Sequence, residues 1–335
     1  MTETTAPAPS PDRWPPTTTS GGTGTIPLGR GGVGVFPLCL GGNVFGWTAD
    51  EAASHAVLDA FADAGGNLVD TADAYSHWVE GNSGGESEAV IGRWAAERGV
   101  GGGFLVATKT GMLPGADLSR ASVDAALDAS LGRLQRDAVD LYYAHVDEED
   151  RPVEEVVATF AGLVADGRAR SWGVSNWSAA RISAAVAAAR EASVPGPVAV
   201  QNEGSAVVPT DPAVLSAAAE AGMLALPYST LASGFLSGKY SREGDLPSSP
   251  RAGGVRDKHM NERGWAVLDA VTEVARGRDA EVASVALAWL RAQGMVPIAS
   301  ARTPQQLRPL LAGALMELSA DELHAITGAG AGSAA

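Results

Sequence analysis

Short apolar runs alternate with longer amphipathic segments over most of the 335-residue chain. The runs have the length of buried strands, whereas the longer segments repeat apolar residues at the spacing of one helix face, as at Val123, Leu127 and Leu131. Cap residues such as Thr48 and Ser119 and glycines such as Gly99 divide the two kinds of segment. The predicted strands are residues 38–41, 66–70, 104–108, 139–143, 170–174, 198–201, 223–227 and 295–299, and the predicted helices are residues 50–64, 86–98, 120–133, 153–166, 178–191, 212–221, 262–276 and 303–313.

Eight strand–helix units in succession predict the α/β class and, within it, a single closed (β/α)8 TIM barrel. The competing architecture is an open doubly wound sheet, which normally carries a G-x-G-x-x-G turn between its first strand and first helix. Here residues 40–46 follow the first strand and read Leu-Gly-Gly-Asn-Val-Phe-Gly, which does not meet that pattern. The sequence therefore favours the barrel.

The two ends of this pattern and one long connection complete the predicted organisation. Residues 1–24 are rich in Pro, Thr, Ser and Gly, which is typical of a disordered tail, and residues 25–330 are expected to form one barrel domain. Residues 26–36 are expected to form a short hairpin. The longest loop, residues 228–261, follows the seventh strand and carries several lysines and arginines. Long loops in compact domains are often lids or binding loops.

Composition narrows the classes of function. A hydrophobic fraction of 45% with no apolar stretch of about 20 residues indicates a soluble globular protein without a membrane span. One cysteine, Cys39, and no visible secretory signal indicate a reducing, cytoplasmic location. The net charge of −15 argues against nucleic acid or an anionic membrane as a partner, and it requires any anionic cofactor to meet locally concentrated cations. The oligomeric state is left open.

Four polar residues follow three of the predicted strands: Asp70 and Tyr75, Lys109, and His145. Because the carboxyl ends of barrel strands share one face, these side chains are expected to meet there. Each residue alone has an ordinary structural explanation, such as a helix cap or a satisfied core histidine. Four such residues converging from three strands favour a catalytic site.

This group suits the protonation of a carbonyl oxygen. An ammonium group beside a phenol favours the phenolate, so Lys109 is expected to lower the pKa of Tyr75 from about 10 and make it a usable proton donor. Asp70 would pair with Lys109, and His145 would hydrogen-bond the carbonyl oxygen. No side chain delivers hydride, so a nicotinamide or flavin cofactor is needed.

Residues after the later strands supply candidate cofactor and substrate contacts. Amide and hydroxyl groups suited to a carboxamide, an aromatic ring and a phosphate-binding arginine follow strands five to eight: Ser175, Asn176, Gln201, Tyr228 and Arg302. Three tryptophans just past strands one, two and five are candidates for a substrate pocket: Trp47, Trp78 and Trp177. The chain has no Cys/His cluster at ligand spacing, so no metal is indicated.

An ordered set of motifs resembles the aldo-keto reductase family from about Thr25 to Thr327. The motifs are Asp-Thr-Ala-x-x-Tyr at 70–75, Thr-Lys at 108–109, His145, Gly-Val-Ser-Asn at 173–176, Gln-Asn-Glu at 201–203, and Tyr-Ser at 228–229 leading to Gly-Lys-Tyr at 238–240. The resemblance implies a (β/α)8 barrel that binds NADPH, with Tyr75 as general acid and Asp70, Lys109 and His145 completing a tetrad. It further implies that Ser175, Asn176 and Gln201 hold the carboxamide, that Tyr228 stacks on the nicotinamide, and that the phosphates are bound by Ser229, Leu231, Gly234, Lys239, Ser300, Arg302 and Gln306.

Three departures from the family pattern bear on the cofactor. Gly204 replaces a frequent aromatic residue, residues 299–302 lack a usual glycine, and Leu310 stands where an adenine-contacting asparagine is common. NADPH is favoured, with NADH as the alternative. The predicted function is NADPH-dependent reduction of an aldehyde or ketone. The alternatives are a cofactor-sensing protein with little turnover, like certain channel subunits of this family, and a sugar-ketone reductase of a biosynthetic pathway.

Overall fold

Eight parallel strands form one sheet in the computed structural model, which describes residues 24–100, 102–244, 246–248 and 251–331. The strand order is β10-β3-β4-β5-β6-β7-β8-β9, and two backbone hydrogen bonds join the two ends of this order. Val296 donates to the carbonyl of Ala225 (3.0 Å) and Ile298 to that of Pro227 (2.9 Å). The predicted (β/α)8 barrel is confirmed. Its strands are β3 (Cys39–Gly41), β4 (Leu68–Asp70), β5 (Leu105–Thr110), β6 (Leu141–Ala144), β7 (Trp172–Ser175), β8 (Ala199–Gln201), β9 (Leu224–Ala225) and β10 (Ile298–Ala299).

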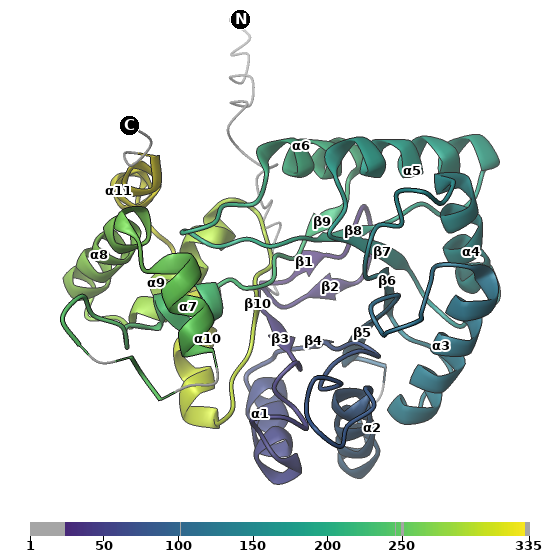
Figure 1. Cartoon of the computed structure of the whole chain (residues 1–335), viewed down its shortest axis with the longest axis horizontal. Coiled ribbons are helices and arrows are strands. Elements are labelled where there is room, and N and C mark those ends of the chain that lie inside the picture. The colour runs from purple at the N-terminus through teal and green to yellow at the C-terminus, as the bar shows by residue number, and fades with distance from the viewer. Residues whose placement is uncertain (1–23, 101, 245, 249–250, 332–335) are drawn as a thin grey trace, which may run out of the picture.

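Helices surround the strands on all sides of the view in Figure 1. All eight predicted helical segments are helices, and each differs from its predicted bounds by two residues or fewer at either end. They are α1 (Glu51–Asp63), α2 (Glu86–Arg98), α3 (Arg120–Leu134), α4 (Val153–Ala165), α5 (Ala179–Ala192), α6 (Pro212–Ala221), α8 (Glu262–Gly277) and α10 (Pro304–Leu315). Within the described ranges, none of the helices is long and apolar enough to cross a membrane.

Side-chain caps fix where several helices begin. Ser119 accepts a hydrogen bond from the Ser122 amide at the start of α3, as its sequence position predicts. For α1 the predicted cap, Thr48, is wrong. Asp50 is the cap, and its side chain accepts a hydrogen bond from the first-turn amide of Ala53. Asp50 offers a charged acceptor and stands directly before Glu51, the first helical residue, whereas Thr48 lies two residues earlier. These caps matter for the site because each helix start follows a strand end at the same face of the barrel.

Four helical segments were not predicted: η1 (Ala232–Ser237), α7 (Ala252–His259), α9 (Val282–Ala292) and α11 (Ala320–Ala331). Helix α9 is buried from Ala283 through Leu290 and packs against α8 and α10, although its apolar residues do recur at helical spacing. The first two lie within residues 228–261. The long loop after the seventh strand is therefore partly helical and packs against α8 and α9.

A two-stranded hairpin of β1 (Ile26–Pro27) and β2 (Gly34–Val35) precedes the barrel, as predicted. It is tied to the amino end of β4, because the Asn67 side chain accepts from the Phe36 amide (2.7 Å) and donates to the Gly34 carbonyl (2.9 Å). Its apolar side chains join the inner core formed by alternate residues of the strands. The hairpin thus covers the barrel end opposite the strand carboxyl ends. Residues 1–23 of the predicted tail lie outside the described residues.

Gly173 in β7 tests how tightly the barrel wall is packed. A Cβ atom there would lie 2.6 Å from a ring carbon of Tyr143 and 2.8 Å from the Ala199 carbonyl oxygen. Because both neighbours belong to adjoining strands, we expect Gly173→Ala to lower the free energy of unfolding by about 1–3 kcal/mol, measured in urea. The control is Gly132→Ala in α3, where nothing lies within 4 Å and helix propensity should add about 0.5–1 kcal/mol. Equal stability of the two variants would contradict the packing argument.

Candidate active site

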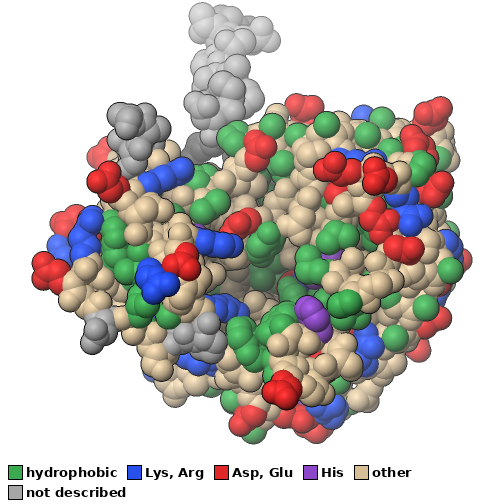
Figure 2. All heavy atoms as spheres, in the orientation of Figure 1, with side chains coloured by type: hydrophobic (Ala, Val, Ile, Leu, Met, Phe, Trp, Pro, Cys, Tyr) green, Lys and Arg blue, Asp and Glu red, His purple; other side chains and the backbone are tan. Residues whose placement is uncertain are grey.

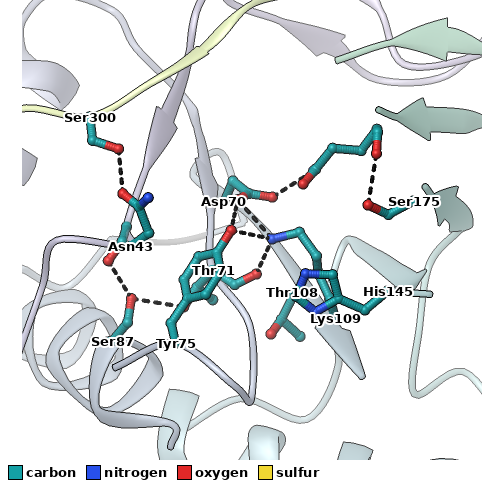
Figure 3. Close-up of polar contacts among 12 residues, drawn as sticks. Asn43, Asp70, Thr71, Tyr75, Ser87, Thr108, Lys109, His145, Ser175 and Ser300 are labelled. Carbon is teal, nitrogen blue, oxygen red and sulfur yellow. Dashed lines mark hydrogen bonds and ion pairs between the residues drawn. The ribbon is translucent and has the colours of Figure 1, made fainter. Parts of the chain in front are cut away.

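Lys109 is the centre of a polar cluster at the carboxyl end of the barrel (Figure 3). Its side chain is 0% exposed, and its ammonium group donates three hydrogen bonds. The acceptors are Oδ2 of Asp70 at 2.8 Å, the hydroxyl of Tyr75 at 2.7 Å and the carbonyl of Thr71 at 2.8 Å. All three protons of the ammonium are therefore used. The structure brings Asp70, Tyr75 and Lys109 together as the sequence predicts.

Asp70 receives hydrogen bonds from three different segments of the chain. Besides Lys109, the Tyr75 hydroxyl donates to Oδ2 at 2.9 Å and the Gln201 amide donates to Oδ1 at 2.8 Å. The Gln201 carbonyl in turn accepts from the Ser175 hydroxyl at 2.7 Å. Gln201 was predicted to contact a cofactor carboxamide, but its side-chain amide donor is engaged with Asp70. In the structure, Gln201 links the Asp70 carboxylate, through its side chain, to Ser175 of β7, through its backbone carbonyl.

The pKa of Tyr75 is raised well above its usual value of 10, first by burial and then by the Asp70 carboxylate. The expectation that Lys109 would lower this pKa is wrong in direction. A carboxylate that accepts the phenol's own proton favours the neutral phenol, and this effect together with burial outweighs the ammonium. Tyr75 therefore remains protonated throughout the neutral range, which is the form that a proton donor needs.

His145 follows β6 beside this cluster, with its ring centroid 6.3 Å from that of Tyr75. Burial, followed by the positive charge of Lys109, holds its pKa well below 6.5. The imidazole is therefore neutral at neutral pH. Its Nδ1 atom has no hydrogen-bond partner among the residues that the structure describes. A neutral imidazole of this kind can donate one hydrogen bond to a carbonyl oxygen without adding charge.

Asn176 connects the cluster to the next part of the rim. Its backbone has φ = 63°, a left-handed conformation that Asn adopts more readily than most residues. Its Nδ2 donates to the His145 carbonyl (3.0 Å), and its Oδ1 accepts from the Tyr228 hydroxyl (2.8 Å). With Ser175 directly before it, Asn176 forms a continuous polar wall beside the tetrad. These are three of the residues predicted to contact a nicotinamide.

The chain after β9 makes an unusual backbone turn. Ser229, Ala232, Ser233 and Gly234 all have positive φ, between 48° and 96°. The amides of Ala232 and Gly234 donate to the carbonyls of Ser229 (2.7 Å) and Leu231 (2.9 Å), so these hydrogen bonds close the turn. A Cβ on Gly234 would lie 3.1 Å from the Lys239 ammonium, so this cation packs directly on the turn. The neighbouring Leu231, also a predicted contact, is partly buried.

Three cations gather on this side of the barrel mouth. Burial and then Arg302 and Arg251 lower the pKa of Lys239, and burial and then Arg302 lower that of Arg251. In a chain of net charge −15, cations that lie close enough to lower one another's pKa mark a place suited to an anion. Arg251 was not singled out from the sequence. In the sequence, Arg251 is one of several basic residues in the loop 228–261. Two others in this loop, Arg242 and Arg256, form ion pairs with surface aspartates.

The start of α10 lies next to these cations. Thr303 caps the helix, and the Gln306 side chain accepts from the backbone amide of Arg302 at 3.0 Å. Gln306, a predicted cofactor residue, is thus part of the helix cap. Ser300 donates to the side chain of Asn43 at 2.6 Å, and Asn43 itself was not identified from the sequence. A helix amino terminus with a guanidinium beside it is a favourable phosphate site.

Two of the three candidate pocket tryptophans form a pair next to Tyr75, with Trp78 in contact with the Tyr75 ring and Trp47 in contact with Trp78. The Trp47 and Trp78 rings meet edge to face at 5.5 Å, and Trp78 lies 6.4 Å from the Tyr75 ring. Figure 2 shows a hollow near the middle of the molecule, bordered by hydrophobic side chains. Trp177 is different: it is 1% exposed in the core and donates to the Val146 carbonyl, so its assignment to the pocket is corrected. Its indole packs beneath the rim.

The buried ion pair makes a stability prediction. Asp70→Asn leaves the Lys109 ammonium buried without its counter-charge, so we expect the free energy of unfolding to fall by about 3–5 kcal/mol in denaturant titrations. Lys109→Met should cost a similar amount, and the double variant should lose much less than the sum. Asp257→Asn, in an exposed pair with Arg256, serves as the control and should change little. Additive losses in the double variant would rule out the proposed pairing energy.

Comparison with known proteins agrees with this geometry. A solved structure, the glycerol dehydrogenase AKR11B4 from Gluconobacter oxydans, superposes with a TM-score of 0.75 at 25% identity, covering 91% of this chain and 94% of that one. An uncharacterized oxidoreductase of Bacillus subtilis, YrpG, is 30% identical over 88% of this chain and 91% of its own length. The aldo-keto reductase yakc [NADP(+)] of Schizosaccharomyces pombe is 28% identical over 84% and 83%. The sequence model of the Aldo/keto reductase family matches residues 37–331, and the chain therefore belongs to this family of oxidoreductases.

Proposed function

We propose that this chain is a cytoplasmic, NADPH-dependent reductase of aldehydes or ketones, with its active site in a single barrel domain of residues 25–330. The observation that carries the proposal is the position of the Tyr75 hydroxyl. It accepts a hydrogen bond from the buried Lys109 ammonium and donates one to Asp70, at the mouth of the barrel. In this position the Tyr75 phenol can give up its proton, because the Lys109 ammonium lies next to the phenolate that remains.

The residues around the mouth fit a nicotinamide dinucleotide. Ser175, Asn176 and Tyr228 offer hydroxyl, amide and aromatic groups next to the tetrad. Lys239, Arg251 and Arg302 repel one another, and an anionic diphosphate and a ribose phosphate would relieve that repulsion. The name of the fission-yeast relative, which includes NADP(+), supports the phosphorylated cofactor. When bound, the reduced nicotinamide supplies hydride to the carbonyl carbon.

The chain's own residues handle the proton. The carbonyl oxygen lies within reach of His145, whose neutral imidazole orients it. The Tyr75 hydroxyl turns from Asp70 to this oxygen and gives up its proton as the carbon accepts two electrons, so that an alcohol forms. Lys109 stabilises the phenolate that remains, and Asp70 holds Lys109 in place. Water then returns a proton to the phenolate, and the reverse sequence oxidises an alcohol with Tyr75 as base.

Tyr75→Phe tests the proposed acid directly. It removes one oxygen and leaves the ring, so NADPH binding should stay within about twofold while kcat falls by about 100-fold or more. The measurements are NADPH fluorescence titration and NADPH oxidation against a panel of aldehydes, ketosugars and quinones. Tyr240→Phe is the matched control, because that hydroxyl has no hydrogen-bond partner among the described residues. The role of Tyr75 would be refuted if the variant lost both NADPH binding and turnover, or if it kept both.

The same panel separates the alternatives. A rice protein named as a probable voltage-gated potassium channel subunit beta is 31% identical over 78% of this chain, which keeps a cofactor-sensing function with little turnover in view. Wild-type turnover no faster than NADPH release on every carbonyl would favour that function. A clear preference for ketosugars would favour the sugar-ketone reductase.

The cation cluster predicts how cofactor choice is made. Arg302, next to the amino terminus of α10, is assigned the ribose phosphate, so Arg302→Ala should weaken NADPH binding about tenfold and leave NADH binding unchanged. Lys239→Ala should weaken both, because it is assigned the diphosphate that the two cofactors share. The measurement is fluorescence titration, with Arg242→Ala, which removes a surface pair with Asp269, as the control. An equal loss for both cofactors in Arg302→Ala would overturn the assignment.

A further inference from the structure

A buried serine at the start of α2 is hydrogen-bonded to the ends of two strands. Ser87 is fully buried, and its hydroxyl accepts from the Thr71 hydroxyl at 2.8 Å and donates to the Gly42 carbonyl at 2.8 Å (Figure 3). Thr71 directly follows β4, and Gly42 directly follows β3. A carbonyl can only accept, so Ser87 gives its single proton to Gly42 and receives the proton of Thr71. The direction of this short chain of hydrogen bonds is therefore fixed.

Thr71 also supplies one of the three acceptors of Lys109. Its backbone carbonyl accepts from the Lys109 ammonium at 2.8 Å. The residue before it, Asp70, is tied to the same neighbour as Ser87, because the Asp70 backbone carbonyl accepts from the Gly42 amide at 2.7 Å. These contacts close a ring that connects the ends of β3 and β4 with the first turn of α2. A shift of Thr71 within this ring displaces an acceptor of the buried ammonium.

The next residue of α2 holds the strand that carries Lys109 itself. Glu88 is fully buried, and its carboxylate accepts from the Thr108 hydroxyl at 2.5 Å and from the Arg133 guanidinium at 2.7 Å. Thr108 directly precedes Lys109 in β5, and Arg133 supplies the counter-charge that a buried carboxylate needs. The first turn of α2 is thus bonded to both β4 and β5. This turn fixes where the two strands place their tetrad residues.

Loss of the Ser87 hydroxyl would leave two buried groups without their partners. The Thr71 hydroxyl would lose its acceptor and the Gly42 carbonyl its donor, and each such loss costs free energy in a buried place. The two groups could bond to each other only if the Thr71 backbone moved, because the Ser87 oxygen now bridges the space between them. Such a movement would displace the Thr71 carbonyl from its contact with the Lys109 ammonium.

We propose that Ser87 is a positioning residue for the reductase reaction proposed above, and that it acts through Thr71 to hold the Lys109 ammonium beside the Tyr75 hydroxyl. The inference rests on the proposed function, in which Lys109 stabilises the Tyr75 phenolate. An ammonium that has lost one of its acceptors shifts away from the phenol. The transition state then loses stabilisation, whereas the binding of substrate and cofactor does not change.

The test is steady-state carbonyl reduction by Ser87→Ala and by a matched variant, Ser54→Ala. Ser54 is an equally buried serine in α1, and its hydroxyl donates to the Asp50 carbonyl at the start of its own helix at 2.6 Å. Ser87→Ala should lower kcat about tenfold, because small displacements of a catalytic group are costly. The KM for the carbonyl and the affinity for NADPH should stay within about twofold, as expected when only the transition state is affected. Ser54→Ala should keep the wild-type kcat.

A pair of substitutions at Thr71 separates the hydroxyl from the packing of the side chain. Thr71→Val replaces the hydroxyl with a methyl group and should lower kcat about as much as Ser87→Ala does. Thr71→Ser restores the hydroxyl without the methyl group and should recover most of the lost kcat. A role in packing alone would leave Thr71→Ser no more active than Thr71→Val. If Ser87→Ala does not fold, this comparison decides the question.

The double variant Ser87→Ala/Thr71→Val tests whether the two residues act in one chain. Its kcat should be no lower than that of the weaker single variant, because either substitution already breaks the same chain of hydrogen bonds. Losses in kcat that multiply in the double variant would contradict the proposed route through Thr71.

The outcomes distinguish this inference from the proposed function. Turnover in the wild type that is lost in Tyr75→Phe supports the function. A wild-type kcat in Ser87→Ala, or the same loss of kcat in Ser54→Ala, would then overturn the role of Ser87 alone. A raised KM with an unchanged kcat would overturn it as well, because Ser87 would then serve binding. No turnover in the wild type on any carbonyl would reject both proposals together.

Discussion

A lysine with no exposed surface is the constraint around which this barrel mouth is built. An ammonium group can be buried only where its protons find acceptors and its charge finds an anion. Asp70 supplies the anion, and Tyr75 and Thr71 supply the remaining acceptors. Asp70 in turn requires Gln201 from the far side of the barrel. One desolvated charge therefore fixes the relative positions of strands β4, β5 and β8 at the end where the proposed chemistry takes place.

The sequence is enough to predict the barrel and the meeting of the tetrad, because both follow from period and topology. Strand-length apolar runs that end in Asp70, Lys109 or His145 must bring those residues to one rim once the strands are parallel. The direction of the Tyr75 pKa shift did not follow, since it depends on which neighbour accepts the phenol proton. Which neighbour accepts the proton depends on distances of a few ångströms between side chains, and the spacing of residues in the sequence does not determine these distances.

Other details were also beyond the sequence for identifiable reasons. Trp177 follows a strand as Trp47 and Trp78 do, but a loop residue can turn inward or outward, and its indole turns into the core. Arg251 is one of several basic residues in a long loop, and only the path of that loop separates it from Arg242 and Arg256. In each case the deciding contact joins segments far apart in the chain.

The hairpin at the start of the described chain has a consequence for traffic through the barrel. It packs into the inner core and is tied to the amino end of β4 through Asn67. Reactants therefore reach Lys109 from the opposite end, through the rim that also carries the cation cluster. Under the proposed function, the cofactor and the carbonyl substrate would both enter and leave the barrel through this rim.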